Sequence, residues 1–312
     1  MNIKIIPYDE IYDENVNQLE RIVFQGKSIQ LRILKKHFLD RAIVFKKYYP
    51  ILTIDERGIV LGTCIAAQTT LKVNDDIFFA GIGFDVKVHP NYRSSGIGRM
   101  MAKFVYKNFF KPENLIKNFI TLKNNNNPVI RLLSKVNDEI NLYDFVYLTI
   151  STKSRIEFSS DLKVCQQLFY VKLYDREEID SSYYKVFTNG LGYFNTHKMY
   201  QLEILKISWI YKLGFAFFRK IKSKRKIHLP EEGEKITFST LFNHTAENIT
   251  HINDVLKELE DAGIKYLMVC CKKNDMVFNA LKKNAINCTD YYILSDFTLN
   301  KTDRITIDVR CL

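Results

Sequence analysis

The hydrophobic positions of the first 150 residues predict alternating strands and helices. Short apolar runs rich in β-branched and aromatic residues are typical of strands, whereas apolar side chains spaced three and four apart are typical of helices. In chain order, the sequence predicts a strand at 3–7, helices at 15–24 and 31–45, strands at 50–55, 59–73 and 77–88, a helix after residue 96, a strand at 119–123, a helix at 127–136 and a strand at 145–150.

The turn after the strand at 77–88 gives the strongest functional signal. It reads RSSGIG from Arg93 to Gly98 and leads into a helix whose apolar face includes Met101 and Val105. The first N–H groups of a helix are unpaired and lie at the positive end of its dipole, which suits a phosphate. Gly96 and Gly98 let the backbone approach a ligand closely. The sequence therefore predicts an anion-binding cradle at the end of a strand.

The surrounding pattern V-x-V-x-P-x-x-R-x-x-G-x-G, formed by Val86, Val88, Pro90, Arg93, Gly96 and Gly98, resembles the acyl-CoA-binding segment of the GNAT acyltransferase superfamily. This resemblance covers roughly residues 1–155 and implies an α/β (α+β) protein with a mixed central sheet flanked by helices. It implies that the loop holds the CoA pyrophosphate and that the strand holds the pantetheine arm through its backbone. The CoA contacts so implied are Val86, Val88, Arg93, Ser94, Ser95, Gly96, Ile97, Gly98, Arg99 and Asn127.

The resemblance also implies direct acyl transfer to an amine, with the N–H of Val88 meeting the thioester carbonyl. Such chemistry needs a base for the ammonium and can use an acid for the departing thiolate. Asp85 is the candidate base; the alternative is a surface Asp paired with Lys87 or Arg99. His89 is a weaker candidate at the end of the strand.

The candidate acid is Tyr143, whose alternative role is packing. Many family members place a Tyr on the helix seven residues after an Asn, but this chain has Ser134 at that distance from Asn127. Asn127 itself either contacts CoA or caps the helix before Pro128.

The second half repeats part of the first. A shift of 148 positions places residues 119–135 over 267–283 without a gap, and identical residues coincide at Asn126/Asn274, Val129/Val277, Leu133/Leu281, Lys135/Lys283 and Tyr143/Tyr291. Residues 235–243 and 252–262 then match the cradle strand and cradle helix, but the turn between them lacks glycine and contains Glu247. We therefore expect two GNAT-like domains, 1–155 and 156–312, the second degenerate and shaping the acceptor site or a homodimer.

Residues 207–226 combine an apolar run, ISWIYKLGFAFF, with the basic run RKIKSKRK. Twelve apolar residues are too few to span a bilayer, which needs about 20. The segment is either a buried helix followed by a solvated basic loop, or an interfacial helix at an anionic membrane. Burial is the favoured interpretation.

Charge and cysteine content limit the remaining function classes only broadly. A net charge of +11 suits an anionic cosubstrate, but also nucleic acid or lipid. Nucleic-acid binding is disfavoured because the basic run lacks interleaved aromatic residues. The six cysteines show no CxxC or metal-ligand spacing, and no secretory leader pattern is seen, so we expect free thiols, no metal and a cytoplasmic location.

Together these observations predict an acetyl-CoA-dependent N-acyltransferase that acts on a small amine. Two alternatives remain open. The acceptor could be membrane-held or long-chain, or the protein could be a non-catalytic CoA-binding scaffold.

Overall fold

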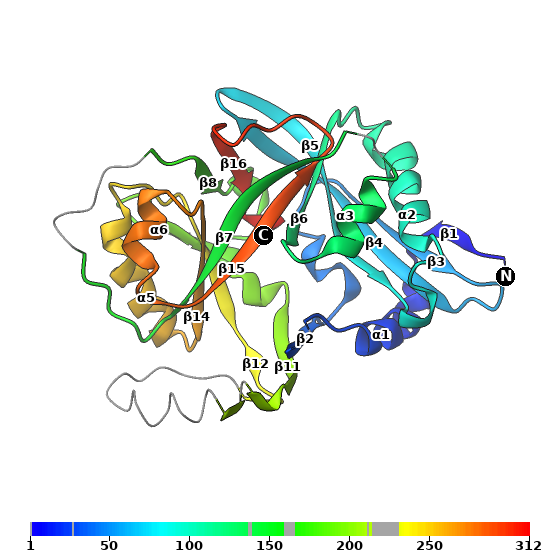
Figure 1. Cartoon of the computed structure of the whole chain (residues 1–312), viewed down its shortest axis with the longest axis horizontal. Coiled ribbons are helices and arrows are strands. Elements are labelled where there is room, and N and C mark those ends of the chain that lie inside the picture. Colours follow the sequence, from blue (N-terminus) through cyan, green and yellow to red (C-terminus); the bar gives the residue numbers. More distant parts are fainter. Residues whose placement is uncertain (1, 27, 137–138, 159–165, 211, 214–230) are drawn as a thin grey trace.

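The computed structural model describes residues 2–26, 28–136, 139–158, 166–210, 212–213 and 231–312 (Figure 1). In the first half these form β1 (Lys4–Pro7), α1 (Asp13–Ile22), β2 (Ile29–Leu34), β3 (Tyr48–Ile54), β4 (Val60–Val73), β5 (Asp76–Val88), α2 (Ile97–Val105), β6 (Lys117–Lys123), α3 (Asn127–Leu133) and β7 (Asn141–Ser151). In the second half they form β8 (Phe169–Lys172), β9 (Tyr184–Val186), β10 (Gly192–Phe194), β11 (Gln201–Ile207), β12 (Lys235–Ile236), β13 (Phe238–Phe242), α5 (Ile252–Asp261), β14 (Tyr266–Cys271), α6 (Met276–Leu281), β15 (Ala285–Ser295) and β16 (Ile305–Asp308).

One mixed sheet runs through both halves, as the sequence predicted for the fold class. Its strand order is β1-β3-β4-β5-β6-β15-β7-β14-β13-β10-β9, and β16 pairs with β4 and β8. The β5–β6 and β13–β14 pairs are parallel, whereas β6–β15, β15–β7 and β7–β14 are antiparallel. A smaller sheet, β12-β11-β2, joins residues of the two halves along the lower edge of the molecule (Figure 1).

The internal repeat is confirmed at the level of elements. Each repeat contains two parallel strands, then a short helix, then a long strand. These elements are β5, β6, α3 and β7 in the first repeat, and β13, β14, α6 and β15 in the second. The two long strands are exchanged, because β7 pairs with β14 of the other repeat and β15 pairs with β6. These two strands cross the middle of the molecule side by side (Figure 1).

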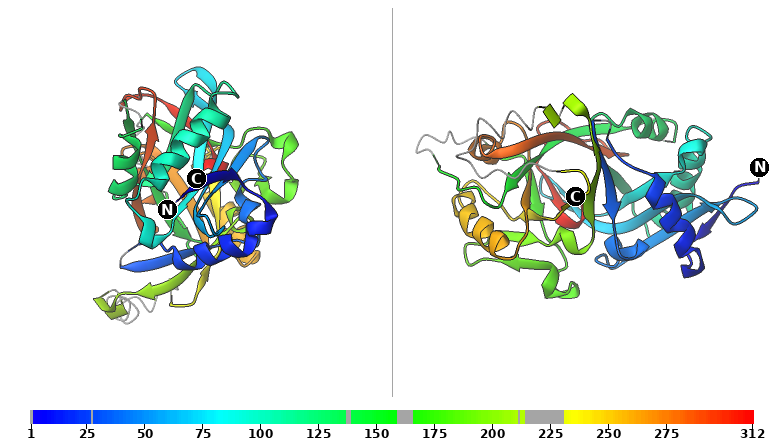
Figure 2. Two further views of the ribbon diagram at one scale, coloured as in Figure 1. Left: turned by 90° about the vertical axis from the view of Figure 1, so that its right-hand side faces the viewer. Right: turned by 90° about the horizontal axis from the view of Figure 1, so that it is seen from below.

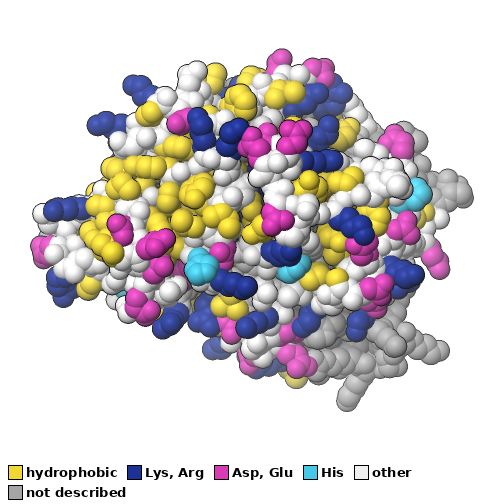
Figure 3. Space-filling model, turned by 180° about the vertical axis from the view of Figure 1, so that it is seen from behind, with side chains coloured by type: hydrophobic (Ala, Val, Ile, Leu, Met, Phe, Trp, Pro, Cys, Tyr) yellow, Lys and Arg dark blue, Asp and Glu magenta, His cyan; other side chains and the backbone are white. Residues whose placement is uncertain are grey.

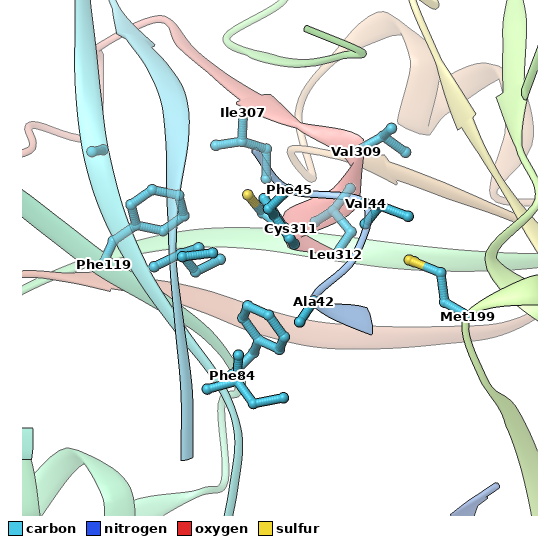
Figure 4. Close-up of a cluster of buried hydrophobic side chains, with 14 of the residues drawn as sticks. Ala42, Val44, Phe45, Phe84, Phe119, Met199, Ile307, Val309, Cys311 and Leu312 are labelled. Atoms are coloured by element: carbon cyan, nitrogen blue, oxygen red, sulfur yellow. The ribbon is translucent and has the colours of Figure 1, made fainter. Parts of the chain in front are cut away.

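The main hydrophobic core also combines residues from both halves. In Figure 4, Phe45, Phe84 and Phe119 of the first half lie with Met199 and Ile307 of the second. Residues 307–312 occupy the centre of the molecule, and the N-terminal end lies at its edge (Figure 2). Because one core spans both repeats, the boundary predicted at residue 155 does not separate two independent cores.

Two predictions from the sequence are wrong. Residues 31–45 were expected to be one helix, but they contain the end of β2 and a 3₁₀-helix at Phe38–Arg41. Leu31 and Ile33 fit a strand period as well as a helical one, and pairing with β11 selects the strand.

The second error concerns residues 207–213, which were expected to be buried. Trp209, Ile210 and Leu213 are 69%, 61% and 60% exposed. Tyr211, the rest of the apolar run and the basic run lie outside the described residues. Ile207 is buried at the end of β11, so the predicted burial fails from Trp209 onward within the described residues.

Charged side chains are mixed on the face seen from behind (Figure 3). Lysine and arginine lie among aspartate and glutamate, around a central group of apolar side chains. The described side chains on this face form no continuous basic stripe of the kind that binds a nucleic-acid backbone.

Candidate acyl-CoA and acceptor site

The site is built on a bulge near the end of β5. The register with β4 passes from Thr63↔Lys87 to Ile65↔Phe84, so Asp85 and Val86 together face Cys64 alone. Asp85 has a left-handed φ of 50°, and the Thr63 hydroxyl donates a hydrogen bond to the Asp85 carbonyl at 3.1 Å. A bulge changes the direction of neighbouring side chains, so Asp85 is buried while Val86 is 49% exposed.

Strand β5 also separates from its neighbour at this point. It pairs with β6 at Ala80–Ile82, and the edge of β5 that faces away from β4 has no strand partner from Gly83 to Val88 within the described residues. Backbone groups on this open edge are free to bond an extended ligand.

The predicted cradle follows the open edge directly. His89 ends the strand, and its Nδ1 accepts a hydrogen bond from the Asn91 N–H at 3.2 Å. Gly96 has a φ of 92° and precedes α2, whose first helical bond runs from the Met100 N–H to the Gly96 carbonyl at 3.0 Å. The N–H groups of Ile97, Gly98 and Arg99 therefore have no acceptor within the helix.

The cradle has the space and exposure that an anion needs. A Cβ on Gly96 would meet no atom within 4 Å, so the surface above it is open. A Cβ on Gly98 would lie 2.4 Å from Leu132 Cδ1, so a larger residue there would require the end of the Leu132 side chain to move. Arg93, Ser94 and Arg99 are exposed around the turn, whereas the Ser95 hydroxyl donates to the Tyr92 carbonyl at 2.6 Å. Free N–H groups, exposed cations and open space together fit a phosphate group.

Asp85 lies in neither of the two environments that the sequence suggested. Its carboxylate accepts hydrogen bonds from Lys35 Nζ at 2.7 Å and Arg41 Nη1 at 3.0 Å. Lys35 Nζ also lies 3.0 Å from Glu20, and Glu20 in turn accepts a bond from Lys87. The result is a largely buried network of three cations and two carboxylates directly beneath the bulge.

This network does not suit a general base at Asp85. Burial alone would raise the pKa of the carboxyl, but the charges of Lys35, Arg41 and Lys87 outweigh burial and hold the pKa well below its usual range. Burial lowers the pKa of Lys87, while Asp85 and Glu20 overcome burial to raise the pKa of Lys35. A carboxylate bound by two cations accepts a further proton poorly, so the geometry favours a positioning role for Asp85.

A cavity of 310 Å³ lies between α1 and β2, beside this network. Its lining includes one carboxylate, Glu20. It also includes four cations, which are Arg21, Arg32, Lys35 and Lys36. Arg32 is already paired with Glu203, at 2.5 Å. The cavity therefore joins the surface to the ion network under the bulge.

The other predicted residues are placed less favourably. The hydroxyl of Tyr143 donates to the carbonyls of Asp303 at 2.9 Å and Leu168 at 3.3 Å, and burial raises its pKa. These contacts are typical of a packing residue and do not suit a proton donor. Asn127 is exposed at the first position of α3, and the N-cap residue is Asn126.

Glu20, Lys35 and Arg41 were not identified from the sequence. They lie on or near elements that are far from β5 along the chain, and Lys35 and Arg41 fell inside the segment expected to be a helix. A charged residue on an amphipathic segment normally faces solvent, so nothing in the local pattern separates these buried cations from ordinary surface residues.

Comparison with known proteins identifies the fold. No protein-family model and no curated protein sequence matches the chain. Crystal structures of Saccharomyces cerevisiae N-myristoyltransferase with bound myristoyl-CoA do match: one aligns with 97% of this chain and 84% of its own at 9% identity and a TM-score of 0.58. Another aligns with 98% of this chain and 81% of its own at 10% identity and a TM-score of 0.59. A ribosomal-protein-S18-alanine N-acetyltransferase from Escherichia coli matches 46% of this chain and 81% of its own, at 11% identity and a TM-score of 0.34.

The chain therefore has a fold similar to that of N-myristoyltransferase, and these alignments extend through both repeats. No helix in the described part of the chain is both long and apolar enough to cross a membrane. Among the same residues, no group of three or more His, Cys, Asp or Glu side chains is arranged to hold a metal ion.

Proposed function

We propose that this protein is an N-acyltransferase that takes an acyl group from acyl-CoA and passes it directly to an amine. The observation that supports this proposal most is the exposed cradle at Gly96, placed at the end of a strand whose edge is open. The fold similarity to an enzyme crystallised with myristoyl-CoA supports it further.

In this proposal, the N–H groups of Ile97, Gly98 and Arg99 bind the pyrophosphate of CoA together with Arg93 and the Ser94–Ser95 turn. The open edge of β5 at Val86 and Val88 binds the pantetheine arm, and a backbone N–H beside the bulge polarises the thioester carbonyl. The amine nitrogen bonds to the carbonyl carbon, the C–S bond breaks, CoA leaves as a thiolate, and the ammonium proton passes to solvent or a base. Asp85 holds Lys35 and Arg41 in place beneath this strand.

The cavity beside α1 is the proposed acceptor entrance. Its volume of 310 Å³ suits a small molecule, and two of its lining cations, Arg21 and Lys36, form no ion pair within the described residues, which favours an acceptor with an acidic group besides its amine. The donor we propose is acetyl-CoA; a longer acyl chain, as in the N-myristoyltransferase crystals, is the alternative.

Replacing Gly96 with Glu tests the cradle. The new carboxylate would stand where the pyrophosphate binds, so we expect the affinity for acetyl-CoA, myristoyl-CoA and free CoA to fall by about tenfold or more. Isothermal titration calorimetry with all three ligands measures the loss, and the preferred ligand in the wild type identifies the acyl chain.

Gly263→Glu is the matched control. Gly263 also has a positive φ (75°) and open space around its missing Cβ, but it follows α5 in the second half. The control variant should bind as the wild type does. Absence of binding by the wild type, or an equal loss in both variants, would refute the proposal.

A second candidate function, transfer to a membrane-held acceptor, is favoured by the exposed side chains of Trp209, Ile210 and Leu213. Exposed tryptophan and aliphatic residues next to basic residues are typical of a segment that lies on a lipid surface. The reaction would be the same, and only the location of the acceptor would differ.

A further inference from the structure

The second repeat has a cavity at the position that corresponds to the cradle. The turn at residues 243–248 connects β13 to the 3₁₀-helix Ile249–His251 and α5, as residues 89–96 connect β5 to α2. A cavity of 370 Å³ lies against this turn and is lined on its other side by residues of β8 and by Arg176. This volume is within the usual range for a small-molecule site.

Two backbone N–H groups of this turn are bonded within the turn itself. The Thr245 N–H donates to Asn248 Oδ1 at 2.8 Å, and the Asn248 N–H donates to the Thr245 hydroxyl at 3.4 Å. The Asn248 side chain also donates to the Asn243 carbonyl at 2.8 Å. Two backbone N–H groups of this turn are therefore engaged by its own side chains, and the charged side chains that line the cavity are the remaining strong anion-binding groups.

Two cations are placed to do this. Lys172 and Arg176 both line the cavity, and within the described residues neither forms an ion pair. Arg176 lies over the ring of Phe242, 5.6 Å from its centroid. The nearby carboxylates Asp175 and Asp308 are engaged with Arg310.

The carboxylate of Glu247 belongs to the same turn, but Glu247 is exposed and does not line the cavity. The lining therefore has positive charge without a matching anion.

His244, one of the residues that line the cavity, has a buried acceptor atom without a partner among the described residues. It is 1% exposed, and its Nε2 lies 2.9 Å from the Cys270 carbonyl, so Nε2 must carry the proton that is donated there. Burial lowers the pKa of His244 to about 4, so the ring is neutral at pH 7. Its Nδ1 is then a lone-pair acceptor, and it has no hydrogen-bond partner within the described chain. A buried acceptor without a partner favours a ligand that brings a donor.

We propose that this cavity is a second ligand site, which takes a small anion that also bears a hydroxyl or N–H group, such as a phosphorylated alcohol. Lys172 and Arg176 bind the anion, and His244 Nδ1 accepts a hydrogen bond from the ligand's donor. The two repeats thus bind anions by different means, the first through backbone N–H groups and the second through side chains.

Calorimetric titration with inorganic phosphate and with glycerol 3-phosphate tests this site. We expect both probes to bind the wild type, glycerol 3-phosphate more tightly because its hydroxyls can reach His244. In the double variant Lys172→Gln/Arg176→Gln the affinity should fall about tenfold or more, since two charge-assisted contacts are lost. Both side chains lack ion-pair partners in the described structure, so the variant should remain folded, which its thermal midpoint checks.

Lys257→Gln/Lys283→Gln is the control, because these two exposed lysines of the second half carry the same charge and also lack ion pairs within the described residues. This control should bind both probes as the wild type does. Gly96→Glu, whose acyl-CoA cradle is blocked, should keep the binding at the second site, and comparison with it removes any phosphate bound by the first cradle. No binding by the wild type at millimolar concentrations would overturn the proposal. An equal loss in the Lys257/Lys283 control would do the same, and loss in Gly96→Glu alone would assign the anion to the first cradle.

Discussion

The environment of Asp85 depends on residues that are distant in the chain. The carboxylate is bonded to Lys35 and Arg41, which precede it by 50 and 44 positions, and the bulge holds its backbone at a φ of 50°. The local sequence shows an acidic residue on the cradle strand and therefore suggested a base. The buried cations that change its chemistry are brought in by the fold alone.

Asp85→Asn removes the charge with little change in shape, and Asn tolerates the left-handed conformation. Two buried cations then lose a counter-charge, so we expect the free energy of unfolding to fall by about 3 kcal/mol at pH 7. The pKa of Asp85 is lower in the folded state than in the unfolded state. Its stabilisation is therefore complete above the unfolded value near 4 and is lost as the pH falls towards the folded value.

Urea denaturation at pH 7 and at about pH 3.5 measures this difference, which should shrink in acid. Asp76→Asn, on the exposed start of the same strand, is the control and should leave stability unchanged. If Asp85→Asn were as stable as the wild type but slow in acyl transfer, the assignment of Asp85 as the base would be restored.

At the scale of elements, the sequence predicted best where the signal is local. The cradle was identified correctly as strand, glycine turn and helix, because its signals lie within 30 residues. Residues 31–45 were not predicted correctly, because their apolar spacing fits both a helical and a strand period. The strand partner of β2, β11, lies about 170 residues away. Nothing local in the sequence states which partner a short apolar segment will find.

The segment after β11 leads to a prediction about membranes. Trp209, Ile210 and Leu213 follow β11 in the chain and are exposed. We expect the wild type to co-sediment with vesicles that contain anionic lipid, and the triple serine variant of these residues to bind several-fold less, because it loses buried apolar area in the interface.

The control replaces three similarly exposed residues elsewhere, Ile77, Phe79 and Ile116, with serine. This variant should sediment like the wild type. A wild type that stays in the supernatant, or a control that loses binding equally, would exclude the segment after β11 as a lipid contact and with it the membrane-held acceptor.

For the whole molecule, the continuous sheet and shared core argue that neither half folds alone. In a fragment of residues 1–155, β6 would lack β15, β4 would lack β16 and β2 would lack β11. We expect fragments 1–155 and 156–312 to be unfolded or aggregated when expressed separately, and to form a soluble complex that binds acyl-CoA when expressed together. Amide proton spectra and calorimetry check this. A well-folded 1–155 fragment that binds acyl-CoA would show instead that the predicted domain boundary is real.

The exchange of β7 and β15 has a meaning for the origin of the chain. If the link between the two repeats is ignored, each repeat corresponds to a subunit whose last long strand pairs with the sheet of the other subunit. This is the geometry of a strand-swapped pair of identical subunits. Fusion of two gene copies would preserve that geometry in a single polypeptide. It would also allow one of the two corresponding turns to change while the other kept its sequence, so that the two turns could diverge as they have here.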